Sequence, residues 1–88
     1  MAEVAHVLAI DLGTGGAKAG LVSSRGEVLA PQFEPVGLHL SADGGAEQDP
    51  EEWWSAICTA TRRVLDQSLI PPTAITAVSC TSQWSGTV

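Results

Sequence analysis

The sequence predicts an α/β fold in which the elements follow the order β-β-β-α-β. Short stretches rich in β-branched and apolar residues, separated by glycine turns, fill the first 35 residues. A long amphipathic segment beginning after Asp49 has the spacing and the N-terminal signals of a helix. A further β-rich stretch follows at residues 75–81. Because a helix connects this stretch to the earlier ones, we expect it to pair in parallel with the first strand.

The first strands are predicted to form an antiparallel meander. Residues 4–11 are apolar with one polar end, which is typical of a buried central strand. A glycine-rich turn at 12–16 leads into residues 17–24, whose side chains alternate between two faces. A second turn precedes residues 27–34, where Pro31 favours an edge strand because proline cannot donate a ladder hydrogen bond.

The start of the helix carries the clearest local signal. Residues 36–48 lack periodicity and are predicted to be a loop. Asp49 then supplies an N-cap carboxylate, Pro50 suits the first helical position, and Glu52 completes a capping box. We expect the helix to run from residue 50 to about 67, since the prolines at 71 and 72 bar its continuation.

A stripe of side chains predicts the helix face that packs against the sheet. Its members recur at helical spacing or widen the stripe: Trp53, Ile57, Thr61 and Val64, with Trp54, Cys58 and Leu65. Both tryptophans are therefore interpreted as structural. Arg62 and Arg63 are predicted to lie in the last turns, where positive charge complements the helix dipole. Cys58 and Cys80 follow no metal or disulfide spacing and are expected to be reduced and packed as small apolar residues.

Composition excludes several function classes. The 88 residues include 10 acidic and 4 basic side chains, so the formal net charge is −6. This balance argues against nucleic-acid binding, which needs clustered Lys and Arg. The N-terminus lacks the pattern of a secretory signal, and the longest unbroken apolar run, residues 7–10, is far too short to span a membrane. We expect a cytoplasmic protein with neither nucleic-acid nor membrane partners.

Residues 11–18 (DLGTGGAK) form the segment whose groups could bind a ligand. They match neither the dinucleotide pattern, whose sixth position here is Lys18, nor the P-loop, because Ala17 separates Gly16 from Lys18. A strand-end aspartate, free turn amides, a hydroxyl and a lysine can nevertheless cradle a phosphate chain, with Asp11 facing a metal ion. The alternative is an ordinary tight hairpin whose aspartate satisfies turn amides.

Three segments resemble known proteins. LAIDLGTGGAKAGLV resembles the first phosphate-binding hairpin of the sugar kinase, actin and chaperone ATPase superfamily. AEQDPEEWW and ITAVSCTSQWSGTV are similar to the N-terminal segment of the FGGY carbohydrate kinases, which include xylulokinase and glycerol kinase. The resemblance implies a ribonuclease H-like fold and a partial kinase N-terminal domain over residues 1–88. A sheet with a parallel pair is normally covered on both faces, and no second helix follows residue 81, which also suggests a truncated domain.

The resemblance also implies roles for the hairpin. Asp11 would face Mg²⁺, usually through water, while Gly13, Thr14 and Gly15 would donate to the phosphates of ATP. Lys18 stands where the family often has a basic residue, and its ammonium could neutralise charge on the transferred phosphoryl group. The alternative for Lys18 is a solvated strand lysine.

The segment after the last strand would help line the sugar site. Gln83 matches a glutamine of the family, and Gly86 matches the glycine after Met-His in xylulokinases. The two positions between them depart from both relatives, since glycerol kinases have Arg-Glu there and this chain has Trp84 and Ser85. Trp84 could stack on a sugar ring and Ser85 could bond a hydroxyl; alternatively, Trp84 packs in a core. The departure weakens assignment to glycerol or xylulose.

The resemblance therefore predicts the N-terminal part of an ATP-dependent kinase acting on a sugar or polyol, with a homodimer left open. The family's general-base aspartate is expected beyond Val88, so these residues alone are expected to be inactive. One alternative is a truncated or degenerate product that acts as an interaction module. Another is the nucleotide-binding domain of a chaperone-like ATPase, against which the EQDPEEWW and SQWSG segments count.

Overall fold

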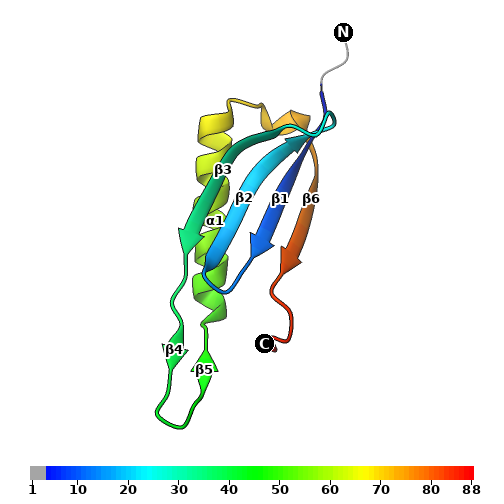
Figure 1. Cartoon of the computed structure of the whole chain (residues 1–88). Helices are drawn as coiled ribbons and strands as arrows, with labels where there is room; N and C mark the ends of the chain where they lie inside the picture. The colour runs from blue at the N-terminus through cyan, green and yellow to red at the C-terminus, as the bar shows by residue number, and fades with distance from the viewer. Residues whose placement is uncertain (1–3) are drawn as a thin grey trace.

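Residues 4–88 are described by a computed structural model, in which helix α1 lies across one face of a mixed sheet (Figure 1). The main sheet has the strand order β3-β2-β1-β6, with β1 in its centre. Strand β1 pairs antiparallel with β2 and parallel with β6, as predicted. The bounds are β1 His6–Leu12, β2 Gly16–Ser23, β3 Val28–Pro35, β4 His39–Leu40, β5 Ala46–Glu47, α1 Pro50–Ser68, the 3₁₀ turn η1 Pro72–Ala74 and β6 Ile75–Ser82.

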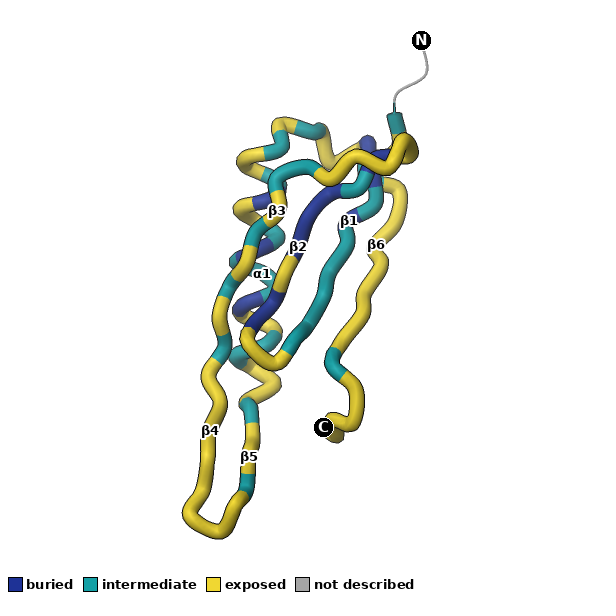
Figure 2. Tube along the Cα trace, in the orientation of Figure 1, coloured by how far each residue is buried: buried dark blue, intermediate teal, exposed yellow. Residues whose placement is uncertain are grey.

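Small side chains hold the helix against the sheet. The buried positions of α1 are Ala56, Ala60 and Val64. Ala60 and Val64 belong to one core cluster with Ala19 and Leu21 of β2. Figure 2 shows the buried positions of α1 and β2 in dark blue. Alanines on both elements allow close approach, which favours dense packing. The buried stripe thus lies beside the larger residues that the sequence indicated, which are half-buried or exposed, apart from Val64.

Two packing predictions are wrong for the described residues. Trp54 is 64% exposed, because it lies on the side of α1 away from the sheet. Cys80 is also exposed, because α1 packs over β2 and β3 and leaves the edge strand β6 uncovered among residues 4–88. Both cysteines are free thiols, as predicted.

Strand β3 forms the other edge of the sheet, as Pro31 indicated. Its pairing with β2 is interrupted between Ala19 and Leu21, opposite Ala30, which has the left-handed φ of 49°. A residue added to one strand in this way bends and twists the edge, which protects it from further pairing.

The sheet face opposite α1 is uncovered among the described residues. Apolar side chains line a hollow on this face, and one of them, Val28, is 61% exposed. Since a sheet with a parallel pair is normally covered on both faces, a second covering layer from further residues stays a prediction.

The N-terminus of α1 is capped differently from the predicted capping box. The Asp49 carboxylate accepts a hydrogen bond of 2.9 Å from the Glu51 N–H, so the N-cap is confirmed. The Glu52 carboxylate does not return to the Asp49 amide. It accepts from the Gly37 N–H at 3.1 Å and lies 3.5 Å from His39 Nε2. Glu52 therefore ties the preceding loop to the first helical turn.

Neither arginine lies in the last helical turn, because α1 continues to Ser68. Arg63 instead forms an ion pair with Glu34 of β3, with an N–O distance of 2.5 Å. Arg63 therefore interacts with a carboxylate across the helix–sheet interface and not, as predicted, with the dipole at the C-terminal end of α1. Since both side chains are partly exposed, the pair adds modest stability.

The C-terminus of α1 offers a stability prediction. Leu69 caps the helix in the left-handed conformation at φ 59° and is 87% exposed, so its side chain contributes little packing. Only glycine adopts this conformation without a steric cost, which is about 1 kcal/mol for other residues. We expect Leu69→Gly to raise the free energy of unfolding by about 1 kcal/mol. Thermal unfolding checks this, and Leu69→Ala, which retains the Cβ, should give no gain.

The predicted loop at 36–48 contains a short hairpin, which is a correction. Strands β4 and β5 pair antiparallel and project beyond the main sheet (Figure 1). At its tip the Ser41 hydroxyl and the Gly45 N–H both donate to Asp43, which lowers the pKa of that carboxyl. Strands of two residues carry no periodicity that a sequence could display.

No helix among residues 4–88 combines the length and apolar character needed to cross a bilayer.

Candidate functional site

The turn between β1 and β2 presents backbone donors at its tip. The Gly13 N–H is used within the turn, where it donates to the Gly16 carbonyl at 3.0 Å. The N–H groups of Thr14 and Gly15 have no hydrogen-bond partner among residues 4–88. Of the residues expected to contact phosphate through their amides, Thr14 and Gly15 thus have donors available. Gly13 instead shapes the turn that presents them.

Gly16 is where the hairpin requires glycine most strongly. A Cβ at this position would overlap the Glu34 carbonyl oxygen and lie 2.8 Å from both Phe33 Cζ and Pro35 Cα of β3. At Gly13 and Gly15 the nearest atoms to such a Cβ are 3.7 and 3.9 Å away, which is ordinary contact. The close approach of β3 to β2, rather than the phosphate tip, therefore sets the glycine requirement.

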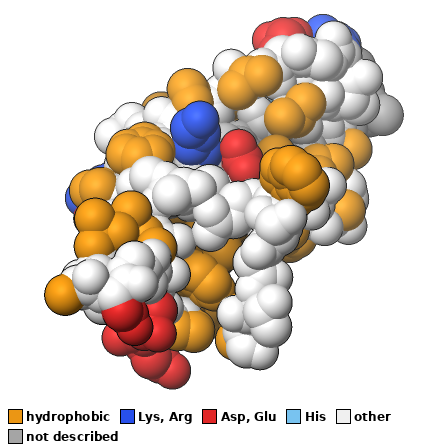
Figure 3. All heavy atoms as spheres, turned by 60° about the horizontal axis from the view of Figure 1, so that its bottom comes forward, with side chains coloured by type: hydrophobic (Ala, Val, Ile, Leu, Met, Phe, Trp, Pro, Cys, Tyr) orange, Lys and Arg blue, Asp and Glu red, His pale blue; other side chains and the backbone are white. Residues whose placement is uncertain are grey.

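Asp11 and Lys18 lie side by side on the uncovered sheet face. Asp11 pairs with Lys18 in β2 and with Thr81 in β6, so the three side chains form a row across the sheet. All three line one shallow hollow of about 360 Å³. Figure 3 shows a basic and an acidic group next to each other, with hydrophobic side chains around them. Neither Asp11 nor Lys18 forms an ion pair with another described residue, so both charges are available to a ligand.

The metal prediction rests on Asp11 alone. No cluster of three or more His, Cys, Asp or Glu side chains suited to a metal ion occurs among residues 4–88. This donor set fits Mg²⁺ carried by a nucleotide, because Mg²⁺ is commonly held by one or two carboxylates, substrate phosphates and water. It does not fit a metal held by protein ligands only. Asp11 is partly exposed and stands directly before the hairpin, where such an ion could reach it.

A ring of hydrogen bonds joins the hairpin tip to the segment after β6. The Thr14 hydroxyl donates to Gln83 Oε1, Gln83 Nε2 donates to Gln48 Oε1 at 3.0 Å, and Gln48 Nε2 donates to the Thr14 carbonyl at 2.8 Å. Gln48 Nε2 also lies 3.2 Å from the Gly37 carbonyl, and the Gln83 N–H donates to the Leu12 carbonyl at 2.9 Å. The predicted phosphate and sugar segments are therefore in direct contact.

Beside this ring lies a groove of about 650 Å³, which contains the predicted sugar-binding residues. Trp84 is 90% exposed, so the core interpretation of this side chain does not hold within the described residues. Ser85 adopts a left-handed φ of 64°, which turns the chain after Trp84. The groove is lined by Thr14, Leu38, Ala46, Glu47, Gln48, Pro50, Trp53 and residues 83–88.

Asp11 and Lys18 are separated from this groove by the hairpin. They face the uncovered side of the sheet, while Thr14 and Gln83 meet at the end of the sheet near the start of α1. Only Thr14 belongs to both the hairpin tip and the groove lining. The predicted site residues therefore form two groups, one carrying charge and one carrying amides, hydroxyls and an indole.

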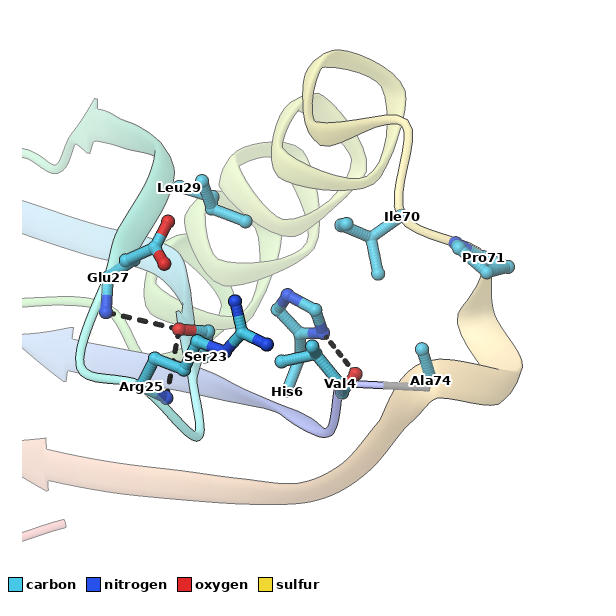
Figure 4. A pocket seen from close by; sticks show the side chains of 9 residues that line it. All are labelled: Val4, His6, Ser23, Arg25, Glu27, Leu29, Ile70, Pro71 and Ala74. Carbon is cyan, nitrogen blue, oxygen red and sulfur yellow. Dashed lines mark hydrogen bonds between the residues drawn. The ribbon is translucent and has the colours of Figure 1, made fainter. Parts of the chain in front are cut away.

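A second hollow lies at the opposite end of β1, but its polar groups serve the fold. His6 Nδ1 donates to the Val4 carbonyl at 2.9 Å, and Ser23 Oγ accepts from the amides of Arg25 and Glu27 at 3.2 and 3.1 Å (Figure 4). These bonds close the β2–β3 turn and fix the entry to β1. The sequence assigned no function to His6, and none is assigned here.

Gln48 is the site residue that the sequence reasoning did not single out. It belongs to the EQDPEEWW run, where the adjacent acidic and capping residues drew attention. Its role depends on partners 34 and 35 positions away along the chain. The signal that could have identified it is the position itself, directly before an N-cap, which fixes its direction relative to the helix.

Comparison with known proteins gives a consistent result. The profile of the "FGGY family of carbohydrate kinases, N-terminal domain" matches residues 6–88. A glycerol kinase of Xanthobacter autotrophicus is 37% identical over 79 residues, which are 90% of this chain and 16% of the relative. A xylulose kinase of Escherichia coli is 42% identical over 60 residues, which are 68% of this chain and 12% of the relative.

A solved structure supports the same grouping. The crystal structure of gluconate kinase from Lactobacillus acidophilus superposes with a TM-score of 0.80 at 25% sequence identity. The similarity covers 92% of this chain and 16% of that protein. The chain thus spans about a sixth of the length of the glycerol kinase and of the gluconate kinase.

Proposed function

The chain belongs to the FGGY family of carbohydrate kinases, with the actin and sugar kinase type of ribonuclease H-like fold, and we propose that it is the N-terminal part of an enzyme that transfers the γ-phosphoryl group of ATP to a hydroxyl of a sugar or polyol. The domain assignment, residues 1–88 as a partial kinase N-terminal domain, belongs to the same proposal. So do a cytoplasmic location and a homodimeric full-length protein.

One observation carries the proposal: the glycine hairpin and the groove share Thr14. Its amide, with that of Gly15, is unbonded and points from a turn, which suits phosphate oxygens. The groove on its other side is lined by Trp84, Ser85 and the Gln83 amide, a mixture of apolar and hydrogen-bonding groups that suits a polyhydroxylated ligand. A phosphate donor and a hydroxyl acceptor would thereby be held next to each other, which is what group transfer requires.

The charged pair supplies the electrostatic part. Lys18 would hold the phosphate chain and neutralise charge that develops on the transferred group. Asp11, its neighbour in the sheet, would hold Mg²⁺ through water, and the bound ion would screen the charge of the β- and γ-phosphates. In this arrangement the chain contributes positioning and charge. The general base is expected from residues outside 1–88.

A substrate screen tests the proposal. Full-length protein carrying this segment is mixed with MgATP and a panel of pentoses, hexoses and polyols, and ADP release is followed by a coupled assay. We expect turnover with at least one member of the panel. Protein that binds MgATP but turns over none of them would support the degenerate, non-catalytic alternative. ATP hydrolysis that no sugar stimulates would instead favour a chaperone-like ATPase.

Trp84 gives a prediction specific to the sugar. Because 90% of its surface is exposed at the edge of the groove, a sugar ring can stack on the indole, and losing this contact removes about 1.4 kcal/mol, or tenfold in affinity. We expect Trp84→Ala to raise the KM for the sugar about tenfold while the KM for ATP stays within about twofold. Steady-state kinetics with each substrate varied measures this.

Trp54→Ala is the matched control for Trp84→Ala. Trp54 is also exposed, at 64%, but it lies on the outer side of α1 and does not line the groove. Its removal should leave both KM values unchanged. An equal increase in sugar KM for the two variants would show that Trp84 has no stacking role.

A further inference from the structure

Gln48 occupies a position from which it contacts both substrate-binding segments. Its Nε2 donates to the carbonyl of Thr14, in the phosphate hairpin, and its Oε1 accepts from the amide of Gln83, in the sugar segment. Its second Nε2 bond reaches the Gly37 carbonyl at 3.2 Å. Three of the four hydrogen bonds that a glutamine amide can make are therefore formed within the protein.

The donors and acceptors of the ring can be arranged in only one direction. Gln83 Oε1 cannot donate, so the Thr14 hydroxyl must donate its single proton to it. Gln83 Nε2 then donates to Gln48 Oε1, which leaves Gln48 Nε2 to donate to the Thr14 carbonyl. A change at any member removes a partner from the other two. The ring therefore links its members energetically as well as spatially.

The ring is anchored to the start of helix α1. Gln48 directly precedes the N-cap Asp49, whose side chain is held by the first turn. Gly37, the third partner of Gln48, donates its N–H to Glu52 in the same turn at 3.1 Å. The start of the helix thus holds Gln48 through its chain neighbour Asp49 and through Gly37, and Gln48 in turn bonds both Gln83 and Thr14.

We propose that Gln48 is a positioning residue that couples nucleotide binding at the hairpin to sugar binding at Gln83. In the free protein the Thr14 proton is committed to Gln83 Oε1. A phosphate oxygen that attracts this hydroxyl frees Gln83 Oε1 to accept from a sugar hydroxyl. Gln48 keeps the Gln83 amide directed toward the groove while its partner changes. Nucleotide and sugar therefore strengthen each other's binding, and this inference rests on the proposed function.

The experiment uses the full-length protein and two variants of equal shape change. Gln48→Met keeps side-chain length and removes all three hydrogen bonds. Gln32→Met is the matched control, because Gln32 Nε2 makes a similar amide–amide bond of 2.8 Å to Gln67 Oε1 away from the groove. Calorimetry measures the dissociation constant of the best substrate in the sugar screen, with and without the MgATP analogue adenylyl imidodiphosphate.

We expect the analogue to tighten sugar binding at least fivefold in the unmodified protein and in Gln32→Met, and less than twofold in Gln48→Met. The sugar affinity of Gln48→Met without nucleotide should change much less than its coupling. Equal coupling in Gln48→Met and the control, or no coupling in the unmodified protein, would overturn the inference while leaving the kinase proposal intact. Failure of every sugar in the screen would instead overturn the proposed function, and with it this inference.

A second measurement does not depend on substrate. In the free protein, hydrogen exchange of the hydrogen-bonded amides of Gly13 and Gln83 should be faster in Gln48→Met than in the unmodified protein. Gln32→Met should leave both segments unchanged. Loosening of one segment alone would show that Gln48 does not join them.

Discussion

Replacing Asp11 by Asn should lower kcat of the full-length kinase by about 10²- to 10³-fold. The substitution keeps the size of the side chain and removes its charge, so the neighbouring Lys18 and Thr81 retain their positions in the sheet. What is lost is the anionic group proposed to hold Mg²⁺ beside the phosphates. The apparent affinity for Mg²⁺ should fall together with kcat, as measured by titrating the ion at saturating ATP and sugar.

Sugar binding should hardly change in the same variant. Asp11 lies on the uncovered sheet face and does not line the groove that contains Gln83 and Trp84. Calorimetric affinity for the sugar is therefore expected to stay within about twofold of that of the unmodified protein. Asp66→Asn, at an exposed position near the end of α1, serves as the control and should leave kcat unaltered. Equal losses of sugar affinity and turnover in Asp11→Asn would indicate a structural role for the carboxylate.

The fold was predictable because its signals are local. Glycine turns, alternation and an Asp-Pro helix start each act over a few residues, and these signals predicted the order of the main strands and α1. The parallel pairing of β1 and β6 followed from the connection between them. Pro31 located the edge strand by its missing donor alone.

The details that differed depend on partners distant in the sequence. The Glu52 carboxylate had two possible hydrogen-bond donors, the Asp49 amide nearby and the Gly37 amide on the incoming loop, and it accepts from the second. Arg63 is drawn to Glu34 across the helix–sheet interface rather than to the helix end. The buried stripe includes Ala60, because Ala19 of β2 is small enough to permit close contact between the helix and the sheet.

In the candidate site, too, some residues could be predicted from local patterns and others depend on partners distant in the sequence. Asp11, Thr14 and Gln83 stand in segments with recognisable patterns, and the structure brings Thr14 and Gln83 together. Gln48 has no pattern of its own, because an amide becomes informative only when its partners are known. The commitment of the Gly13 amide to the turn likewise depends on the carbonyl of Gly16, whose position the sequence alone does not specify.

Gly16→Ala should destabilise the protein more than a methyl group added at any other position of the hairpin. The added Cβ would overlap the Glu34 carbonyl and come within 2.8 Å of Pro35 Cα, and both are backbone atoms that no side-chain rotation can move. Strand β3 would have to separate from β2 at the end of the sheet that carries the hairpin. Overpacking of this kind costs about 3 kcal/mol, which should appear as a lower thermal unfolding midpoint or a loss of soluble protein.

Gly13→Ala separates this packing effect from the general effect of replacing glycine in the turn. The nearest atom to a Cβ at Gly13 lies 3.7 Å away, and its φ is not positive, so the alanine fits without strain. Restricting the unfolded chain should then raise stability slightly, by about 0.5 kcal/mol. A loss of stability in Gly16→Ala together with a gain in Gly13→Ala would show that contact with β3, rather than turn flexibility, requires glycine at position 16. Equal small effects would mean that β3 moves away at little cost, so the hairpin would be held mainly by the ring through Thr14 and Gln48.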